Sequence, residues 1–150
     1  MYCTYVSGPL HDIDDALVRM RRLWSAAPRG VDMSSVLVVE ACARAGGPAT
    51  VGDVARVADV EHSTASRLVE RAVRAGYVER AADGRRAALH LTADGRALRE
   101  RAVAFRTAWL TEMVGDWPDE DVAAFARLLT RFAERIAEKG GPGALLPPDP

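Results

Sequence analysis

Hydrophobic residues recur at helical spacing in the middle of the chain. In VEHSTASRLVERAVRAG, residues 60–76, the apolar positions follow steps of three and four, so they share one face of a helix. This inner face consists of Ala65, Leu68, Val69, Ala72 and Val73. The opposite face carries hydroxyl, imidazole and guanidinium groups. We expect Glu61 to cap the start of this helix and Gly76 to end it in the left-handed conformation.

A shorter helix is predicted just before this one. Thr50 can act as its N-cap, and Asp53 can complete a shortened capping box. Its buried side is expected to contain Val51, Val54, Ala55 and Ala58. Between the two helices, Asp59 is among the few residues other than glycine that tolerate the positive φ of a sharp turn. The two helices therefore predict a helix-turn-helix.

Alternating residues after this pair predict a β-hairpin. Residues 77–80 and 87–91 alternate in strand fashion around Asp83-Gly84, a dipeptide that favours a two-residue type I′ turn. The tip would then carry Arg85-Arg86. The order of helix, turn, helix and hairpin indicates a winged helix-turn-helix, and DNA binding is the first function that it suggests.

A further helix precedes the short one and ends before Gly46-Gly47-Pro48. Asp32 or Ser34 can cap it. Its core-facing residues are expected to be Val36, Leu37, Val39 and Ala41. With this helix, the winged helix-turn-helix extends over about residues 31–91.

Amphipathic patterns flank the winged segment. Residues 10–27 and 92–139 are predicted to be helical, with a break at Trp117-Pro118, and residues 140–150 to form a loose tail. The flanking stripes could close an intramolecular core or pair with a second chain. One short helix reads few base pairs, whereas a two-fold pair supplies affinity and half-site spacing, so we expect dimerisation. The expected interface residues are Ile13, Leu17, Met20, Val122, Phe125, Leu129, Phe132 and Ile136.

The charge is concentrated in the segment that carries the candidate DNA-binding face. The net charge of the chain is −1, but residues 62–106 hold 10 Arg and 5 acids, which gives +5. The flanking segments 1–61 and 107–150 carry −2 and −4. A local basic surface suits phosphate contacts, because the position of the charge matters as much as its sum.

Other chemistry finds little support in the sequence. No apolar run reaches the roughly 20 residues of a membrane span, and the acidic N-terminus lacks a signal peptide pattern, which predicts a cytoplasmic protein. Cys3 and Cys42 are interpreted as structural thiols, and no His/Cys/carboxylate spacing indicates a metal or cofactor. We see no phosphate loop, nucleophile elbow or paired carboxylates, so no enzyme is expected.

Several fragments make the chain similar to the MarR family of bacterial transcriptional regulators over roughly residues 10–139. They are STASRLVERAVRAGYVER, the Asp83-Gly84-Arg85 wing motif and LHLTADGRAL from Leu89 to Leu98. The resemblance implies a single MarR-like domain over residues 1–150, mainly α with a small β-hairpin wing, which dimerises through its N- and C-terminal helices on a pseudo-palindromic operator. It also implies that Asp83 braces an arginine such as Arg71. Only Ala81 and Ala82 separate Arg80 from Asp83, so the wing is shorter than is usual for the family.

The leading hypothesis is thus a homodimeric DNA-binding regulator, in most such families a repressor, that a small-molecule effector releases from double-stranded DNA. The residues expected to contact DNA are Thr50, His62, Ser63, Thr64, Ser66, Arg67, Arg71, Arg85 and Arg86. No ligand-binding residue is assigned. The alternative is a winged-helix protein-interaction module without DNA binding, which the near-neutral total charge and the short wing favour.

Overall fold

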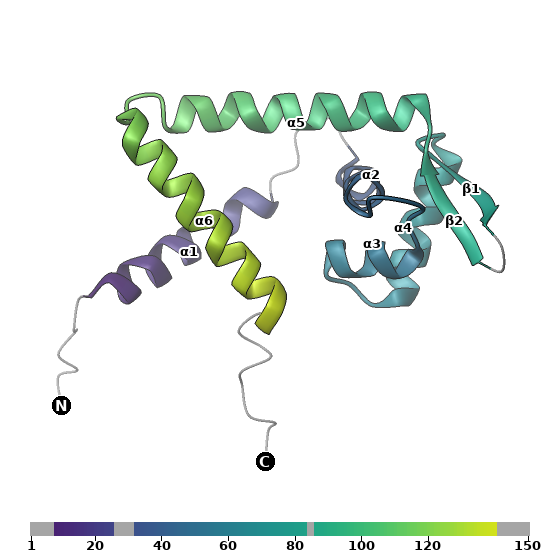
Figure 1. The fold of residues 1–150 in the computed structure, drawn as a ribbon, viewed down its shortest axis with the longest axis horizontal. Coiled ribbons are helices and arrows are strands. Elements are labelled where there is room, and N and C mark those ends of the chain that lie inside the picture. Colours follow the sequence, from purple (N-terminus) through teal and green to yellow (C-terminus); the bar gives the residue numbers. More distant parts are fainter. Residues whose placement is uncertain (1–7, 26–31, 84–85, 141–150) are drawn as a thin grey trace, which may run out of the picture. The chain divides into compact units, whose positions relative to one another are not determined.

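The structure is a computed structural model that describes residues 8–25, 32–83 and 86–140. Its elements, labelled in Figure 1, are α1 (Pro9–Ser25), α2 (Met33–Arg44), α3 (Val51–Ala58), α4 (His62–Arg74), β1 (Val78–Asp83), β2 (Arg86–Leu91), α5 (Ala93–Met113) and α6 (Asp119–Lys139). The predicted fold class, mainly α-helical with a small hairpin wing, is confirmed. Contacts divide the chain into two units, Met1–Ala102 and Val103–Pro150. That residues 1–150 form one MarR-like domain stays a prediction.

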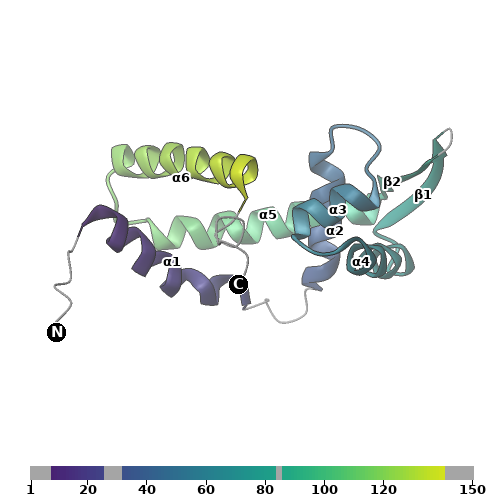
Figure 2. The same ribbon diagram turned by 90° about the horizontal axis from the view of Figure 1, so that it is seen from below.

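The core of the first unit lies among α2, α3, α4 and the hairpin, which are grouped in both ribbon views (Figures 1 and 2). Its largest fully buried side chains are Leu89, Val38, Val39, Val54, Val69 and Val78. The sequence pattern placed Leu37 in this core, but Leu37 is only half-buried and Val38 is fully buried. The pattern was wrong here because α2 is buried around most of its circumference, so no single stripe marks its inner face.

The predicted ends of α3 and α4 are formed by local interactions. Thr50 and Asp53 make the expected capping box, and Asp59 adopts the expected left-handed conformation with φ 51°. Gly76 follows α4 with φ 79°. Glu61 occupies the N-cap position of α4, but its side chain makes no capping hydrogen bond, so the prediction that Glu61 caps the helix was wrong.

The hairpin differs from the prediction by one residue in its turn. Val78 pairs with Leu91 and Asp83 pairs with Arg86, so the loop positions are 84 and 85 instead of Asp83-Gly84. Val78 is buried opposite Leu91, which packs against the core, and this apolar pair holds the register at the base of the hairpin. Ala49 pairs with Leu89 in an antiparallel bridge on the other side of β2.

The first turns of α5 belong to the first unit. Leu98 is buried in the core and Ala102 packs against it. Gly95 is buried against the backbone of Tyr77, and a Cβ added at Gly95 would overlap the Tyr77 carbonyl oxygen. The start of α5 is therefore part of the same core as α3 and α4.

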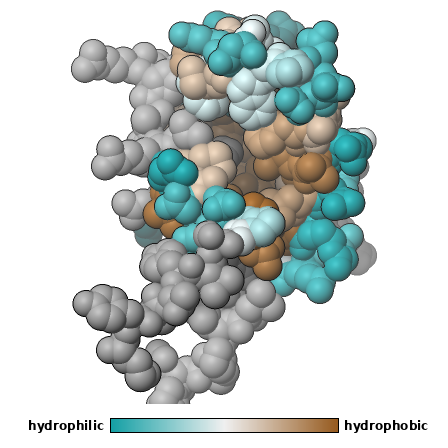
Figure 3. Space-filling view, turned by 90° about the vertical axis from the view of Figure 1, so that its left-hand side faces the viewer, coloured by the Kyte–Doolittle hydropathy of each residue, from teal (hydrophilic) through white to brown (hydrophobic). Residues whose placement is uncertain are grey.

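The flanking helices expose their hydrophobic stripes. On α1, which ends at Ser25, Ile13, Leu17 and Met20 are exposed. On α6, Val122 is half-buried, and the stripe members that are 40–46% exposed are Phe125, Leu129, Phe132 and Ile136. The space-filling view shows brown hydrophobic side chains gathered between teal hydrophilic ones (Figure 3). Residues 26–27, where the first helix was predicted to end, lie outside the described residues.

We predict that Gly95→Ala lowers the stability of the fold. Alanine usually favours a helix by about 1 kcal/mol over glycine, but the new Cβ would meet the Tyr77 backbone, which cannot move aside without disturbing the end of α4. We expect a loss of about 1–3 kcal/mol, typical of overpacking, in urea unfolding followed by circular dichroism.

Gly52→Ala is the matched control, because Gly52 also lies in the first turn of a helix. Its added Cβ would meet only Thr50 Oγ1, at an ordinary contact distance of 3.5 Å. We expect this variant to match the parent or to gain up to about 1 kcal/mol. Equal stabilities of the two alanine variants would contradict the close contact at Gly95.

Candidate nucleic-acid interface

The outward face of α4 gathers most of the side chains that were expected to contact DNA. Ser66 is half-buried, and the remaining members, all exposed, are His62, Ser63, Thr64, Arg67 and Arg71. Arg74 and Arg80 are exposed as well, on the last turn of α4 and on β1. The face combines hydrogen-bonding hydroxyls with guanidinium groups, which can donate to phosphate oxygens and to the acceptor atoms of bases.

The orientation of this face follows from the packing of the opposite one. Ala65, Val69 and Ala72 have no exposed surface, and Leu68 and Val73 pack against the same core. These are the residues that the sequence pattern assigned to the inner face. Since the period of the helix is fixed, their burial directs the polar residues between them toward solvent.

Arg71 is held by the N-terminal end of α2. Its Nη1 donates a hydrogen bond to Ser34 Oγ at 3.2 Å. Asp32, the N-cap of α2, accepts hydrogen bonds from the backbone N–H of Ser34 and from the hydroxyl of Ser35. Burial opposes the ionisation of Asp32, but these hydrogen bonds and the charge of Arg71 keep its pKa below the ordinary value. Arg71 therefore has an anionic neighbour that the sequence pattern did not indicate.

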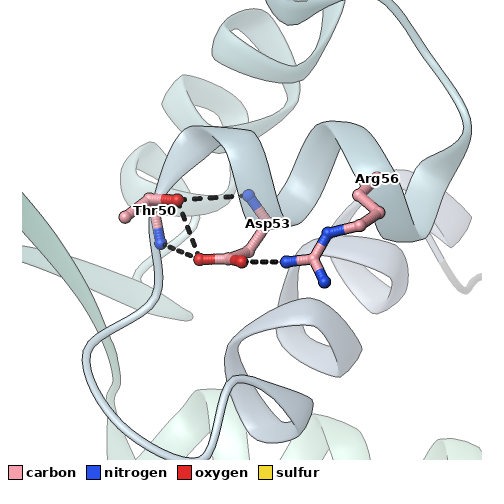
Figure 4. A network of polar contacts seen from close by, with 3 residues as sticks. All are labelled: Thr50, Asp53 and Arg56. Atoms are coloured by element: carbon pink, nitrogen blue, oxygen red, sulfur yellow. Dashed lines mark hydrogen bonds and ion pairs between the residues drawn. The ribbon is translucent and has the colours of Figure 1, made fainter.

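Thr50 forms hydrogen bonds with Asp53 at the start of α3 (Figure 4). Its hydroxyl accepts from the backbone N–H of Asp53 at 3.2 Å and donates to Asp53 Oδ2 at 2.8 Å. Asp53 uses its other oxygen to bind Arg56. The hydrogen bonds from Thr50 lower the pKa of Asp53, so the capping interaction is lost only as the pH falls through that lowered value. That Thr50 contacts DNA stays a prediction. The hydroxyl that would contact DNA already caps α3.

Arg56 is a charged residue beside this cap that the sequence reasoning missed. Its side chain is 75% exposed, and it lies three residues after Asp53 on the same helix. This spacing brings opposite charges together on a helix surface and could have been recognised from the sequence.

Part of the wing lies outside what the structure describes. Arg85 is outside the described residues, and the side chains of Asp83 and Arg86 are not described. The expected DNA contacts of the two arginines and the bracing role of Asp83 therefore stay predictions. At the base of the wing, Glu79 and Arg80 are exposed.

Comparisons with known proteins agree on this fold. Residues 29–87 match the model of the MarR family. A protein from Pseudomonas aeruginosa described as a transcriptional regulator is 28% identical over 83% of this chain and 89% of its own, with a TM-score of 0.62. A MarR family regulator from Silicibacter pomeroyi shares the fold at 21% identity over 89% of this chain and 96% of its own, with a TM-score of 0.69. No curated protein matches the chain.

The chain has the winged-helix fold of the MarR family. Members of the MarR family are transcriptional regulators. BpsR from Bordetella bronchiseptica also shares the fold, at 20% identity over 89% of this chain and 99% of its own, with a TM-score of 0.58. The solved structure of BpsR concerns the regulation of its DNA binding by 6-hydroxynicotinic acid.

The match to the MarR family model begins before α2 and ends within β2. It therefore includes the whole outward face of α4 and leaves out the flanking helices that were expected to dimerise. In the described part of the chain, no helix is long and apolar enough to cross a membrane. The same residues contain no group of three or more His, Cys, Asp or Glu side chains that could hold a metal ion.

Cys42 lies in the core of this MarR-family fold, and Cys3 is outside the described residues. Burial, followed by the nearby charge of Asp53, raises the pKa of the Cys42 thiol from 9.0 to about 11. The thiolate is the reactive form of cysteine, so Cys42 is a poor nucleophile in the folded protein. This agrees with its interpretation as a structural thiol.

We predict that Cys42 resists alkylation in the folded protein. At pH 8, a rise of two pKa units lowers the thiolate population about a hundredfold, and burial slows the reaction further. The reaction of a Cys3→Ser variant with iodoacetamide, followed by intact mass, should be fast in urea and slow in buffer. Similar rates in both solutions would contradict the buried thiol. Between pH 9 and about 11 only the unfolded chain ionises Cys42, so stability should also fall across this range.

Proposed function

We propose that this protein is a homodimeric repressor that binds a pseudo-palindromic operator in double-stranded DNA. A small-molecule effector releases the repressor from this operator. In this proposal, the outward face of α4 of each protomer enters the major groove. The proposed location is the cytoplasm, where such an operator is accessible. The match of residues 29–87 to the MarR family model supports a regulatory role.

The observation that carries the proposal is the outward face of α4. It presents hydroxyls and arginines to solvent, while Ala65, Val69 and Ala72 on the opposite face are fully buried in the core. The segment that contains it, residues 62–106, has a charge of +5 in a chain of net charge −1. Basic charge limited to one surface attracts phosphates there and leaves the rest of the molecule without general affinity for DNA.

The exposed stripe of α6 supports the dimer. Phe125, Leu129, Phe132 and Ile136 follow steps of four, three and four, and each is at least 40% exposed. Large hydrophobic residues in one contiguous row on a protein surface usually mark an interface. A two-fold pair would present two α4 helices to half-sites about 34 Å apart, which is one turn of the duplex.

The effector is proposed from thermodynamic linkage. A small molecule that binds the DNA-incompetent arrangement of the dimer better than the competent one shifts the population away from DNA. BpsR shares this fold, and 6-hydroxynicotinic acid regulates the binding of BpsR to DNA.

We predict that Arg67→Ala weakens binding to the preferred duplex by about 1–3 kcal/mol if Arg67 contacts a base, and lowers the salt dependence if it contacts a phosphate. The duplex is first selected from a random pool, and affinities are then measured by fluorescence anisotropy at two salt concentrations. Arg67 is exposed, so the melting temperature should match that of the parent.

Arg101→Ala removes the same charge from an exposed position on α5 and should leave the affinity unchanged. Equal affinities of the parent and of Arg67→Ala would remove Arg67 from the interface. If the parent itself shows no salt-dependent binding to any duplex, a protein-interaction module becomes the better explanation of the fold.

We also predict that Phe132→Asp dissociates the dimer. A carboxylate without a partner in an apolar interface costs about 3 kcal/mol or more. Sedimentation velocity should show a dimer for the parent and a monomer for the variant. Thr130→Asp adds the same charge at an exposed position of α6 outside the stripe and should stay dimeric. A dimeric Phe132→Asp would place the interface elsewhere.

A further inference from the structure

The C-terminal end of α4 is hydrogen-bonded directly to the start of α5. The backbone N–H groups of Gly76 and Tyr77 donate to the carbonyls of Val73 and Ala72, each at 3.0 Å, which closes the last turn of α4 in a Schellman motif. The carbonyls of Gly76 and Tyr77 then accept two further hydrogen bonds, and both come from Thr92. Its hydroxyl donates to Gly76 O at 2.6 Å and its N–H donates to Tyr77 O at 3.2 Å.

The Thr92 hydroxyl also continues the contact into α5. Thr92 Oγ1 accepts a hydrogen bond from the N–H of Gly95 at 3.0 Å and so caps the first turn of α5. One hydroxyl thus joins the turn that ends α4 to the turn that begins α5. These bonds form a continuous path from the Ala72 carbonyl in α4 to the Gly95 amide in α5.

Gly95 allows the two segments to approach this closely. The position of its missing Cβ is occupied by the carbonyl oxygen of Tyr77, and the carbonyl carbon lies 3.0 Å away. A side chain here would separate α5 from the end of α4 or tilt it. Gly95 does not have a positive φ, so its backbone conformation does not require glycine. Glycine is needed here because there is no space for a side chain.

The next turns of α5 are fixed to the same core. Leu98, three residues after Gly95, is 6% exposed in the core, and Ala102 packs against it one turn later. Between them, Arg99 Nε lies 3.6 Å from Glu40 Oε2 on α2. Beyond Ala102, α5 continues into the second unit of the chain.

We propose that Thr92 and Gly95 are positioning residues, which fix the angle between the reading helix α4 and the long helix α5 and thereby set the half-site spacing that the dimer accepts. This inference rests on the proposed function. Gly95 is buried and Thr92 is half-buried, and neither needs to touch DNA. Their role in specificity is distinct from the contacts that α4 makes.

The length of α5 makes this angle important. Its 21 residues span about 30 Å. A tilt of about 5° at one end of such a helix displaces the other end by about 3 Å, close to the rise of one base pair. A loose junction would therefore let the two reading helices occupy a range of separations, and a tight one selects a single spacing.

Thr92→Val is the test variant, because valine keeps the shape of threonine and removes both hydroxyl hydrogen bonds. Thr92→Ser keeps the hydroxyl and should behave as the parent. Thr111→Val is the matched control, since the Thr111 hydroxyl donates to the Thr107 carbonyl at 3.0 Å, on the same helix but away from the junction. Thermal unfolding by circular dichroism verifies that each variant is folded at the assay temperature.

The functional readout is the affinity for a series of duplexes in which the two selected half-sites are moved apart or together by one or two base pairs. The parent should prefer one spacing over its neighbours by about tenfold or more, as expected when a displaced helix loses base contacts. Thr92→Val should lose or shift this preference while it binds a single half-site like the parent. An unchanged preference, or an equal loss of affinity for all spacings and for the half-site, would overturn the positioning role.

A distance measurement tests the junction without DNA. Spin labels are attached at Arg74→Cys on α4 and Arg101→Cys on α5, both exposed, in a Cys3→Ser background diluted with unlabelled protein. The pulsed EPR distance distribution should be narrow in the otherwise unchanged protein and in Thr92→Ser, and broader or shifted in Thr92→Val. Equal distributions would overturn the proposal. If the parent binds no duplex, the proposed function fails and this distance alone decides whether the junction is rigid.

Discussion

The burial of one narrow face of α4 determines what the rest of the helix can do. Ala65, Val69 and Ala72 are small and have no exposed surface, so the helix lies close against its neighbours in the core. A helix buried on one face cannot rotate without exposing these residues, and each exposed apolar side chain would cost free energy in proportion to its area. The polar face is therefore fixed in direction by hydrophobic packing, before any partner is present.

Most of the interactions that span only a few residues were predicted from the sequence, although the side chain of Glu61 does not cap α4 as expected. The Thr50–Asp53 capping box, the left-handed Asp59 and the Gly76 stop each depend on residue types within one helical turn. The inner face of α4 was also predicted correctly, because a half-buried helix shows its orientation in the spacing of its apolar residues. These features together were sufficient to predict the fold class and the face of α4 that is exposed.

Interactions between distant segments could not be predicted in this way. Arg71 and Ser34 are 37 positions apart, and nothing in either local pattern indicates that they meet. The contact of Gly95 with Tyr77 requires the path of the backbone through the hairpin, which no residue count supplies. Val38 was missed because α2 is surrounded by other elements and has no polar stripe to define its outside. In each case the information lies in the packing of elements and not in their periodicity.

The bridge between Ala49 and Leu89 has a consequence for the behaviour of the hairpin in concentrated solution. An unpaired strand edge is a template on which other chains can add strands and aggregate. At Leu89, β2 has Arg80 on one side and Ala49 on the other, so the strand presents no free edge at this buried residue. The outer edge of β1 carries the exposed charged pair Glu79 and Arg80. The base of the hairpin is thus protected from intermolecular strand pairing.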